Sequence, residues 1–286
     1  MKIINAFILF SLIYFILNLS NDEYENIWRD YPACRLGRLQ SPIEINEYES
    51  TYSNDFSFVY QDYKNFPEEI KLENNSQSNN YALTKEINEG GYINFERVGV
   101  IKQYKFIRVE LYPGLHRIDG DLPDYELHLI HEKNLEFKTN KNQYRSIQDP
   151  NMYLTVVLRY KTEEKCKKDI TKACTSDNGL LKNLLTTGIW GLKDYSFFQE
   201  KRAYFYEGSS MHIPCDENVN YYVVKDNFVI LDDDSLDKIA VPFSKLNALN
   251  RFDRPVYKNF MNYREVMGSN FISFKIFLFL MIFILF

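Results

Sequence analysis

The amino-acid sequence predicts a mainly β protein, folded as a single domain with a few short helices. Apolar and polar residues alternate in many short runs, whereas the spacing of an amphipathic helix is scarce. Tyr and Phe, with 22 residues each, favour the half-buried surface of a pleated sheet. The 286 residues, 45% of them hydrophobic, suffice for a large core, and no internal repeat or long linker divides residues 21–268.

Runs of alternating or continuous apolar residues mark the expected strands. In the segment 104–112, Ile107, Val109 and Leu111 fall on one face. The other expected strands, chosen by the same criterion, cover residues 125–131, 152–160, 203–209, 220–226 and 227–231. One helix is expected over residues 233–246, where an aspartate near the start can cap the first turn.

Both ends of the chain carry apolar segments that we set apart from the folded domain. Residues 1–20 carry a lysine at position 2, continue as an apolar run and end in small and polar residues, which is typical of a secretory signal peptide; a signal anchor is the alternative. In the segment 266–286, the apolar run 271–286 is shorter than the roughly 20 residues that a membrane-spanning helix needs. Gly268 and Ser269 precede it, as at a glycolipid (GPI) attachment site, with a short membrane span as the alternative.

The charge of the chain argues against a polyanionic partner. The net charge is −5, with 34 basic and 39 acidic residues. Removing Lys2 and Lys275, which lie in the two end segments, leaves 32 basic residues and a net charge of −7. Nucleic acid is therefore a poor candidate partner, and sulfated glycans are mildly disfavoured. The Lys-rich segment 161–172 is interrupted by acids and is expected to be a solvated loop.

Four cysteines in a chain expected to be exported indicate two disulfides. Cys166 and Cys174 are close in sequence and would close a local loop within the Lys-rich segment. Cys34 and Cys215 would then pair across most of the domain, a closure worth about 4–5 kcal/mol in the entropic model. Asn74 begins an Asn-Asn-Ser-type acceptor sequence for glycosylation, which agrees with export.

A cluster of titratable residues in the segment 119–134 has the residue types of a metal site. Alternation predicts a strand here, so Glu126 and His128 point to one face and His131 to the other. Only one of the two histidines can therefore join Glu126. A simple ion pair at the surface is the alternative to a functional site.

Four segments together resemble the signatures of the alpha-carbonic anhydrases. "YPACRLGRLQSPIEI" (31–45) is similar to the family's N-terminal signature, and "HRIDGDLPDYELHLIHEKN" (116–134) to its stretch around Glu-Leu-His. "YFYEGSSMHIPCDENV" (204–219) resembles the Tyr-Gly-Ser segment that ends in Pro-Pro-Cys, and "FDRPVYKN" (252–259) the closing Arg-Pro-Val motif. The order is the family's, and the resemblance covers the mature domain, about residues 21–265. It implies the alpha-carbonic anhydrase fold, a large twisted, mostly antiparallel sheet with short peripheral helices.

The resemblance also implies which residues occupy the zinc site. The family binds Zn²⁺ with three histidines, two from a His-x-His strand and one from the Glu-Leu-His strand. His128 takes the third position, and Glu126 would orient it. An ungapped comparison places Val109 and Leu111 at the first two positions, where neither side chain can bind a metal.

A comparison shifted by one residue instead places Glu110 and Tyr112 at those two positions, so neither register supplies an imidazole. Met211 takes the place of the family's threonine that orients the zinc-bound hydroxide. His212 follows at a position that faces the cavity in the family. It could meet His128 and Glu110 in a non-standard metal site.

The remaining residues of the family pattern are interpreted as structural. His116 corresponds to a buried histidine of the family, and His131 lies on the opposite strand face; both are expected to make structural hydrogen bonds. Cys34 and Cys215 fall where secreted members of the family have their disulfide.

These residues predict a protein without zinc, without another cofactor and without catalysis. Carbonic anhydrase chemistry needs three neutral nitrogen ligands and an open position, which together lower the pKa of the bound water to about 7. The chain is then similar to the carbonic-anhydrase-related proteins, which are catalytically silent and of which several act as surface binding or adhesion domains. We expect a C-terminally anchored binding module in the secretory pathway or at the cell surface, with a surface protein or glycan as its partner. The alternatives are a zinc-dependent CO₂ hydratase with non-standard ligands and a scaffold that binds copies of itself.

Overall fold

A computed structural model describes the residues that form the sheet and its immediate connections. These are residues 37–52, 56–61, 73–74, 83–87, 90–97, 100–137, 151–168, 174–176, 180–181, 203–211, 214–230, 257–258 and 267–269. Strands dominate among them, so the prediction of a mainly β fold is confirmed. Such a predominance follows from the alternating pattern and from the abundance of aromatic residues.

The elements follow one another along the chain as a series of strands with the short helix α3 (Glu163–Lys168) after the tenth. The strands are β1 (Ile43–Ile45), β2 (Thr51–Tyr52), β3 (Phe56–Gln61), β4 (Glu73–Asn74), β5 (Leu83–Glu86), β6 (Tyr92–Arg97), β7 (Val100–Pro113), β8 (Arg117–Ile118), β9 (Tyr125–Lys133), β10 (Tyr153–Thr162), β11 (Ala203–Gly208), β12 (Val219–Ile230), β13 (Tyr257–Lys258) and β14 (Met267–Ser269).

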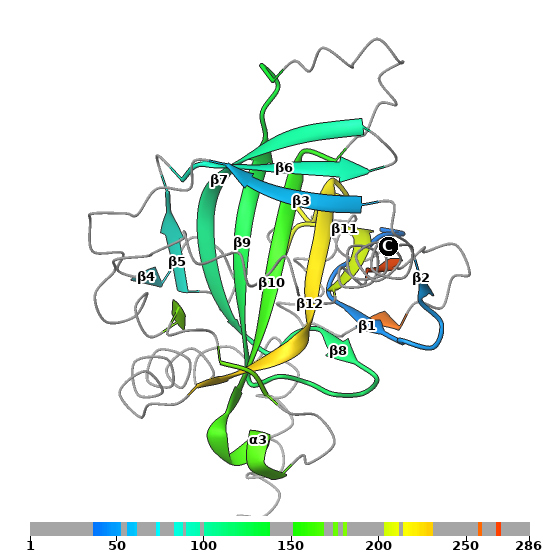
Figure 1. Ribbon diagram of the computed structural model, residues 1–286, viewed down its shortest axis with the longest axis vertical. Coiled ribbons are helices and arrows are strands. Elements are labelled where there is room, and N and C mark those ends of the chain that lie inside the picture. The colour runs from blue at the N-terminus through cyan, green and yellow to red at the C-terminus, as the bar shows by residue number, and fades with distance from the viewer. Residues whose placement is uncertain are drawn as a thin grey trace, which may run out of the picture.

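One large curved sheet organises the domain. Within the described part of the chain, eleven strands join in it, in the order β2-β14-β11-β12-β10-β9-β7-β5-β4, with β6 pairing with both β7 and β3. The long strands β7, β9, β10 and β12 lie side by side at its centre (Figure 1). Most pairs are antiparallel, whereas β10 pairs with β12 and β14 with β2 in parallel. A small parallel sheet, β13-β1-β8, lies beside it. The predicted large, mostly antiparallel sheet is thus confirmed.

Both faces of the central strands are covered by packed side chains. The larger hydrophobic cluster contains Val156 and Leu158 of β10, and a second cluster contains Val157 between them. β10 is therefore buried on both faces, which explains its nearly continuous apolar sequence.

The C-terminal part of the central sheet differs from the prediction in one respect. The two strands expected over 220–226 and 227–231 are a single strand, β12. Its polar residues Lys225 and Asp226 fall where the pairing with β10 is irregular, between the pairs Val157–Val223 and Arg159–Asn227. An irregularity of this kind lets a strand absorb extra residues without ending, so the two expected strands are continuous.

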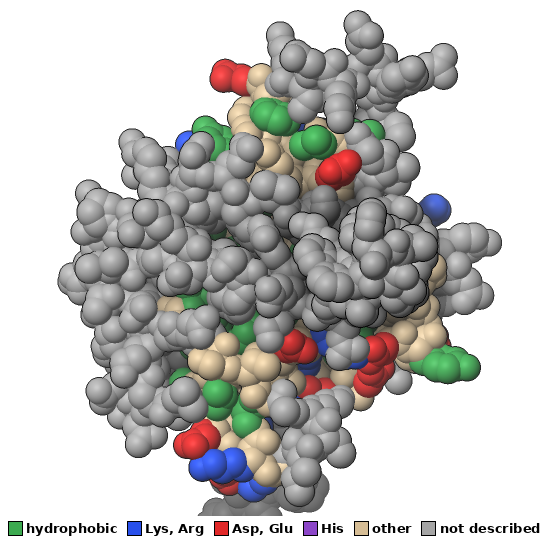
Figure 2. Space-filling model, in the orientation of Figure 1, with side chains coloured by type: hydrophobic (Ala, Val, Ile, Leu, Met, Phe, Trp, Pro, Cys, Tyr) green, Lys and Arg blue, Asp and Glu red, His purple; other side chains and the backbone are tan. Residues whose placement is uncertain are grey.

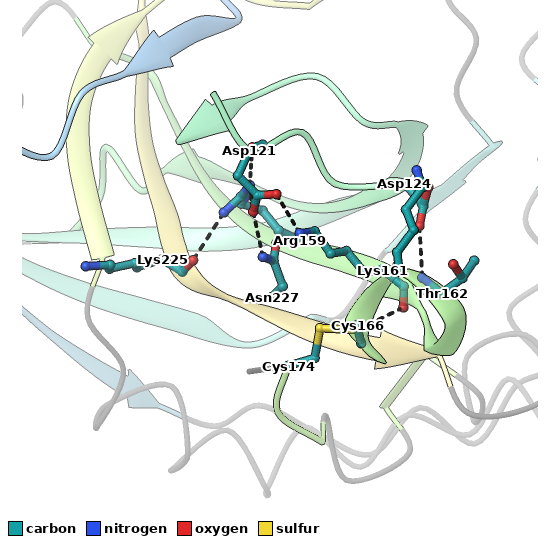
Figure 3. A network of polar contacts seen from close by, with 10 residues as sticks. Asp121, Asp124, Arg159, Lys161, Thr162, Cys166, Cys174, Lys225 and Asn227 are labelled. Atoms are coloured by element: carbon teal, nitrogen blue, oxygen red, sulfur yellow. Dashed lines mark hydrogen bonds and ion pairs between the residues drawn. A yellow bond between two sulfur atoms is a disulfide. The ribbon is translucent and has the colours of Figure 1, made fainter. Parts of the chain in front are cut away.

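The Lys-rich segment after β10 is tied to the sheet. The expected solvated loop over 161–172 is helical over α3, and its predicted disulfide between Cys166 and Cys174 is confirmed (Figure 3). Asp124 accepts a hydrogen bond from the backbone of Thr162 at 2.9 Å and forms an ion pair with Lys165.

On α3 the positive charges are paired with acids one turn earlier, Lys167 with Glu163 and Lys168 with Glu164. Side chains of both signs gather at that end of the molecule, where Figure 1 places α3 (Figure 2). The segment therefore presents a mixed charge, not a basic patch.

Several predicted features lie outside the described residues: the end segment 1–20, the helix over 233–246, Cys34 and the apolar run 271–286. Cys215 takes part in a disulfide. At the C-terminus, β14 pairs with β11 and β2, so the sheet continues past residue 265, where we expected the domain to end. No helix in the described ranges combines the length and apolarity that crossing a bilayer requires.

Candidate ligand cavity and remnant metal site

The carboxylate of Glu126 on β9 collects four hydrogen bonds in the interior. Its Oε1 accepts the backbone N–H groups of His116 at 2.5 Å and Leu115 at 3.1 Å. Its Oε2 lies 2.8 Å from Nδ1 of His116 and 3.0 Å from Nε2 of His128. The carboxylate and both rings are buried. Glu126 thus holds the His128 ring by its Nε2 edge.

This geometry fixes the proton positions on both rings. Burial alone would raise the pKa of the Glu126 carboxyl, but the electrostatic influence of His116 and the hydrogen bonds from both rings hold that pKa far below its usual value. An ionised carboxylate can only accept, so we assign a proton to each ring nitrogen that faces it. In a neutral ring the second nitrogen is then an acceptor, and Nε2 of His116 contacts the hydroxyl of Tyr206 at 2.6 Å.

His131 is separated from this cluster by the sheet itself. Its Nδ1 donates to the carbonyl of Leu154 at 3.0 Å, and its ring packs against Phe106 in the larger hydrophobic cluster. Burial lowers the pKa of His131 to about 3, so the ring is neutral. The two histidines of β9 therefore face opposite sides of the sheet, as strand alternation requires.

A cavity of about 240 Å³ opens beside His128. It is lined by the sheet strands β7, β9, β10 and β12 and by the segment that precedes β12. The lining residues are Ile107, Arg108, Glu110, His128, Ile130, Tyr153, Thr155, Ser210, Met211, Pro214, Asp216, Asn218, Val219 and Tyr221. Polar and charged side chains thus stand beside apolar and aromatic ones.

The side chains of β7 next to His128 form a short polar chain. Glu110 pairs directly with His128 across β7 and β9, and the Tyr112 ring centroid lies 4.7 Å from that of His128. Tyr112 donates a hydrogen bond to Oε2 of Glu110 at 2.6 Å, while Nε of Arg108 lies 2.6 Å from Oε1. Burial and the neighbouring Glu110 raise the pKa of Tyr112 well above 10, so its hydroxyl keeps the proton.

The ungapped comparison with the family predicted Val109 and Leu111 at the first two zinc-ligand positions, next to His128. The structure does not place them there. Val109 and Leu111 are fully buried in the larger hydrophobic cluster, on the opposite face from His128. The cause is an irregularity in the pairing of β7 with β9, where Phe106 pairs with His131 but Arg108 pairs with Ile130. One extra residue, Ile107, shifts every later side chain of β7 to the other face. The structure thus places Glu110 and Tyr112 beside His128, which are the residues given by the comparison shifted by one residue.

The structure describes some of the other predicted site residues. Met211 lines the cavity and is buried in the second hydrophobic cluster, which makes that wall apolar. His212 lies outside the described residues, so its relation to His128 and Glu110 stays a prediction. Asn74 lies in the two-residue strand β4, at the edge of the sheet order.

Comparison with known proteins identifies the family to which the chain belongs. The family model described as eukaryotic-type carbonic anhydrase matches residues 23–268, which is most of the chain. The chain belongs to the eukaryotic-type carbonic anhydrase family. No curated protein sequence matches the chain.

Solved structures agree with the carbonic anhydrase fold. Dioscorin complexed with ascorbate has a TM-score of 0.56 at 16% identity, over 87% of this chain and 93% of that one. The alpha-carbonic anhydrase of Thermovibrio ammonificans with the inhibitor sulfanilamide has a TM-score of 0.51 at 20% identity, over 86% and 94%. The Photobacterium profundum alpha-carbonic anhydrase has a TM-score of 0.53 at 18% identity, over 85% and 95%. At these identities the likeness concerns the fold alone.

The carbonic anhydrase family implies a zinc ion, and the residues beside His128 do not fit one. Catalytic zinc requires three protein ligands in a tetrahedral arrangement with an open fourth position. Beside His128 the described residues supply a carboxylate already paired with Arg108 and a phenol that keeps its proton. Together with His128, these groups offer one imidazole nitrogen, and the charges of Glu110 and Arg108 nearly cancel. The family places three neutral nitrogens at its zinc site.

A second group, His116, Glu126 and His128, brings three potential ligand atoms within 4.8 Å of one another. Its atoms are already engaged, because Glu126 accepts hydrogen bonds from both rings. A cation between them would have to displace protons from two buried rings. This cluster is better explained as the support that orients His128.

Sequence reasoning did not single out Arg108. The signal was present, since residues 108, 110 and 112 are Arg, Glu and Tyr, three side chains with polar ends at alternate positions. The apolar alternation of Ile107, Val109 and Leu111 concealed it, because the irregularity at Ile107 is not visible in the sequence.

Proposed function

We propose that this protein is a catalytically inactive carbonic-anhydrase-related protein whose domain serves as a binding module. One observation carries the proposal: the Tyr112 hydroxyl donates to Glu110 at 2.6 Å beside the His128 ring. These two residues occupy the places in which the family has its His-x-His pair. A protonated phenol and a carboxylate that is paired with Arg108 cannot replace two neutral imidazoles.

The loss of these ligands removes the physical basis of CO₂ hydration. Zinc lowers the pKa of its bound water because the neutral nitrogen ligands leave its charge uncancelled. Here Met211 also replaces the threonine that orients the hydroxide in the family, so an apolar side chain lines that wall of the cavity. What remains is a large sheet with a pocket, which suits binding.

The proposed setting follows from the two end segments. An exported chain with a C-terminal anchor, either a GPI anchor or a short membrane span, would present the folded domain at a cell surface or in a secretory organelle. Its partner would then be a surface protein or a glycan. The net charge of −5 and the paired charges of α3 give no support to a polyanionic partner.

The metal content of the purified protein tests the proposal. We expect far less than one zinc per chain by elemental analysis and no CO₂ hydration above the uncatalysed rate in a stopped-flow assay. One zinc per chain together with turnover would establish the alternative, a hydratase with non-standard ligands.

A variant provides the positive control. The double substitution Glu110→His/Tyr112→His places two imidazoles next to His128, and we expect it to bind one zinc per chain. The matched control is Glu110→His alone, which supplies only two imidazoles and should bind zinc much more weakly. If the double variant binds no more zinc than the single variant, residues 110 and 112 are not the ligand positions.

A further inference from the structure

The cavity beside His128 has an acceptor that the protein itself does not use. His128 is 1% exposed, and its Nε2 edge is turned towards Glu126. Its other nitrogen, Nδ1, has no hydrogen-bond partner among the residues that the structure describes. Because Nε2 carries the proton, Nδ1 presents a lone pair, and His128 lines the cavity. A buried acceptor of this kind favours a ligand with an N–H or O–H donor.

The charged residues next to it favour a neutral ligand. Arg108 and Glu110 both line the cavity, and their ion pair leaves no net charge at this end. Asp216, the other charged lining residue, is exposed to solvent, where its effect is screened. An anion would meet the Glu110 carboxylate and the lone pair of His128. A cation would meet the guanidinium of Arg108.

The three side chains together offer a defined hydrogen-bond pattern. His128 Nδ1 and the Glu110 carboxylate accept, whereas the guanidinium of Arg108 carries five N–H donors and accepts nothing. A primary carboxamide has the complementary pattern, with two N–H donors and one carbonyl acceptor.

The rest of the cavity suits an apolar body of limited size. Ile130, Met211 and the ring of Tyr221 line it, and the Tyr221 ring is held by stacking on Tyr206 at a centroid distance of 4.9 Å. The volume of about 240 Å³ exceeds the roughly 150 Å³ cavity that accepts benzene. One six-membered ring with a carboxamide therefore fits.

We propose that this cavity binds a small neutral ligand with a primary carboxamide on an apolar or aromatic body, held by His128, Glu110 and Arg108 without a metal. This inference rests on the proposed absence of zinc from the cavity. It adds a small-molecule site to the proposed binding module, separate from any macromolecular partner on the outer surface.

Benzamide and benzoate are matched probes, because they share a ring but differ in charge and in donors. The full chain, purified in mild detergent, is titrated with each probe by ligand-observed NMR. We expect benzamide to bind at least tenfold more tightly than benzoate, since about 1.4 kcal/mol from one good hydrogen bond corresponds to tenfold. Equal binding, or tighter binding of benzoate, would overturn the proposal.

Two variants locate the site. His128→Phe keeps a ring but removes the acceptor, and Met211→Trp fills the cavity from the segment outside the sheet. Each should weaken benzamide binding tenfold or more, whereas Leu135→Trp, on an exposed turn, should leave it unchanged. Far-UV circular dichroism checks the fold of each variant, and Met211→Trp decides the matter if His128→Phe does not fold. Benzamide binding that survives in Met211→Trp would place the probe elsewhere.

Zinc is measured on the same samples, so the two proposals fail separately. One zinc per chain with CO₂ turnover would overturn the proposed function, whatever the probe does. Absence of zinc together with no difference between benzamide and benzoate would leave the proposed function intact and overturn the carboxamide site alone.

Discussion

Replacing Glu126 with Gln keeps the shape of the side chain and removes its charge, which tests the cluster that orients His128. Two backbone N–H groups donate to Oε1, and the rings of His116 and His128 donate to Oε2. An amide has only one oxygen. If that oxygen takes the place of Oε1, the amide nitrogen faces the two ring nitrogens, and both rings must move their proton to the other nitrogen to accept from it. If the oxygen takes the place of Oε2, the amide nitrogen faces two backbone N–H donors.

The expected decrease in the free energy of unfolding follows from the hydrogen bonds to the charged carboxylate that the Glu126→Gln substitution removes. Two hydrogen bonds to a charged acceptor contribute about 1.5–3 kcal/mol each, which gives about 3–5 kcal/mol after allowing for partial relaxation. The removal of one partner from a buried ion pair has a cost in the same range, about 3–5 kcal/mol. Domains of this kind are stable by about 5–15 kcal/mol, so the Glu126→Gln protein should fold but be clearly weakened.

Urea unfolding followed by far-UV circular dichroism at pH 7 measures the change. The matched control is Glu132→Gln, an exposed glutamate on the same strand, which should change the free energy of unfolding by less than about 0.5 kcal/mol. If Glu126→Gln differs from this control by less than about 1 kcal/mol, the carboxylate is not the centre of a buried hydrogen-bond cluster.

The same variant carries a pH signature. Because the pKa of Glu126 is lowered in the folded state, its stabilising contribution is complete above the unfolded pKa and is lost as the pH falls below about 4.3. The wild-type protein should therefore lose stability between pH 5 and pH 3 more steeply than the Glu126→Gln variant. Parallel curves would contradict the assignment of an ionised Glu126.

Two further predictions concern the other buried groups. The pKa of His131 is lowered to about 3, so the unfolded chain takes up its proton first as the pH falls below about 6.5 and stability is lost. His131→Gln should reduce the loss of stability between pH 7 and pH 5 by about 2 kcal/mol in urea unfolding, and an unchanged loss would refute this. Arg108→Met leaves the buried carboxylate of Glu110 without its cation and should cost about 2–4 kcal/mol. Adding Glu110→Gln should recover at least about 1 kcal/mol of that, whereas strict additivity would show that the pair is not coupled.

The central strands of the sheet were predictable because their apolar residues form alternating or continuous runs. β9 and β10 lie within two residues of the segments expected from the sequence, and the assignment of Glu126 and His128 to one face, opposite His131, needed only strand alternation. The single strand β12 was not predictable, since Lys225 and Asp226 resemble a turn in the sequence.

What the sequence determined by itself is the inventory of the site: a family signature around His128, and no histidine between residues 79 and 115 to complete a zinc site. Which side chains of β7 face His128 was decided only in the tertiary structure. The irregular pairing at Ile107 turns Glu110 and Tyr112 towards His128 and sends Val109 and Leu111 into the core. A strand's side chains change face when one residue is inserted, and that insertion is fixed by the pairing with β9, which no local property of β7 reveals.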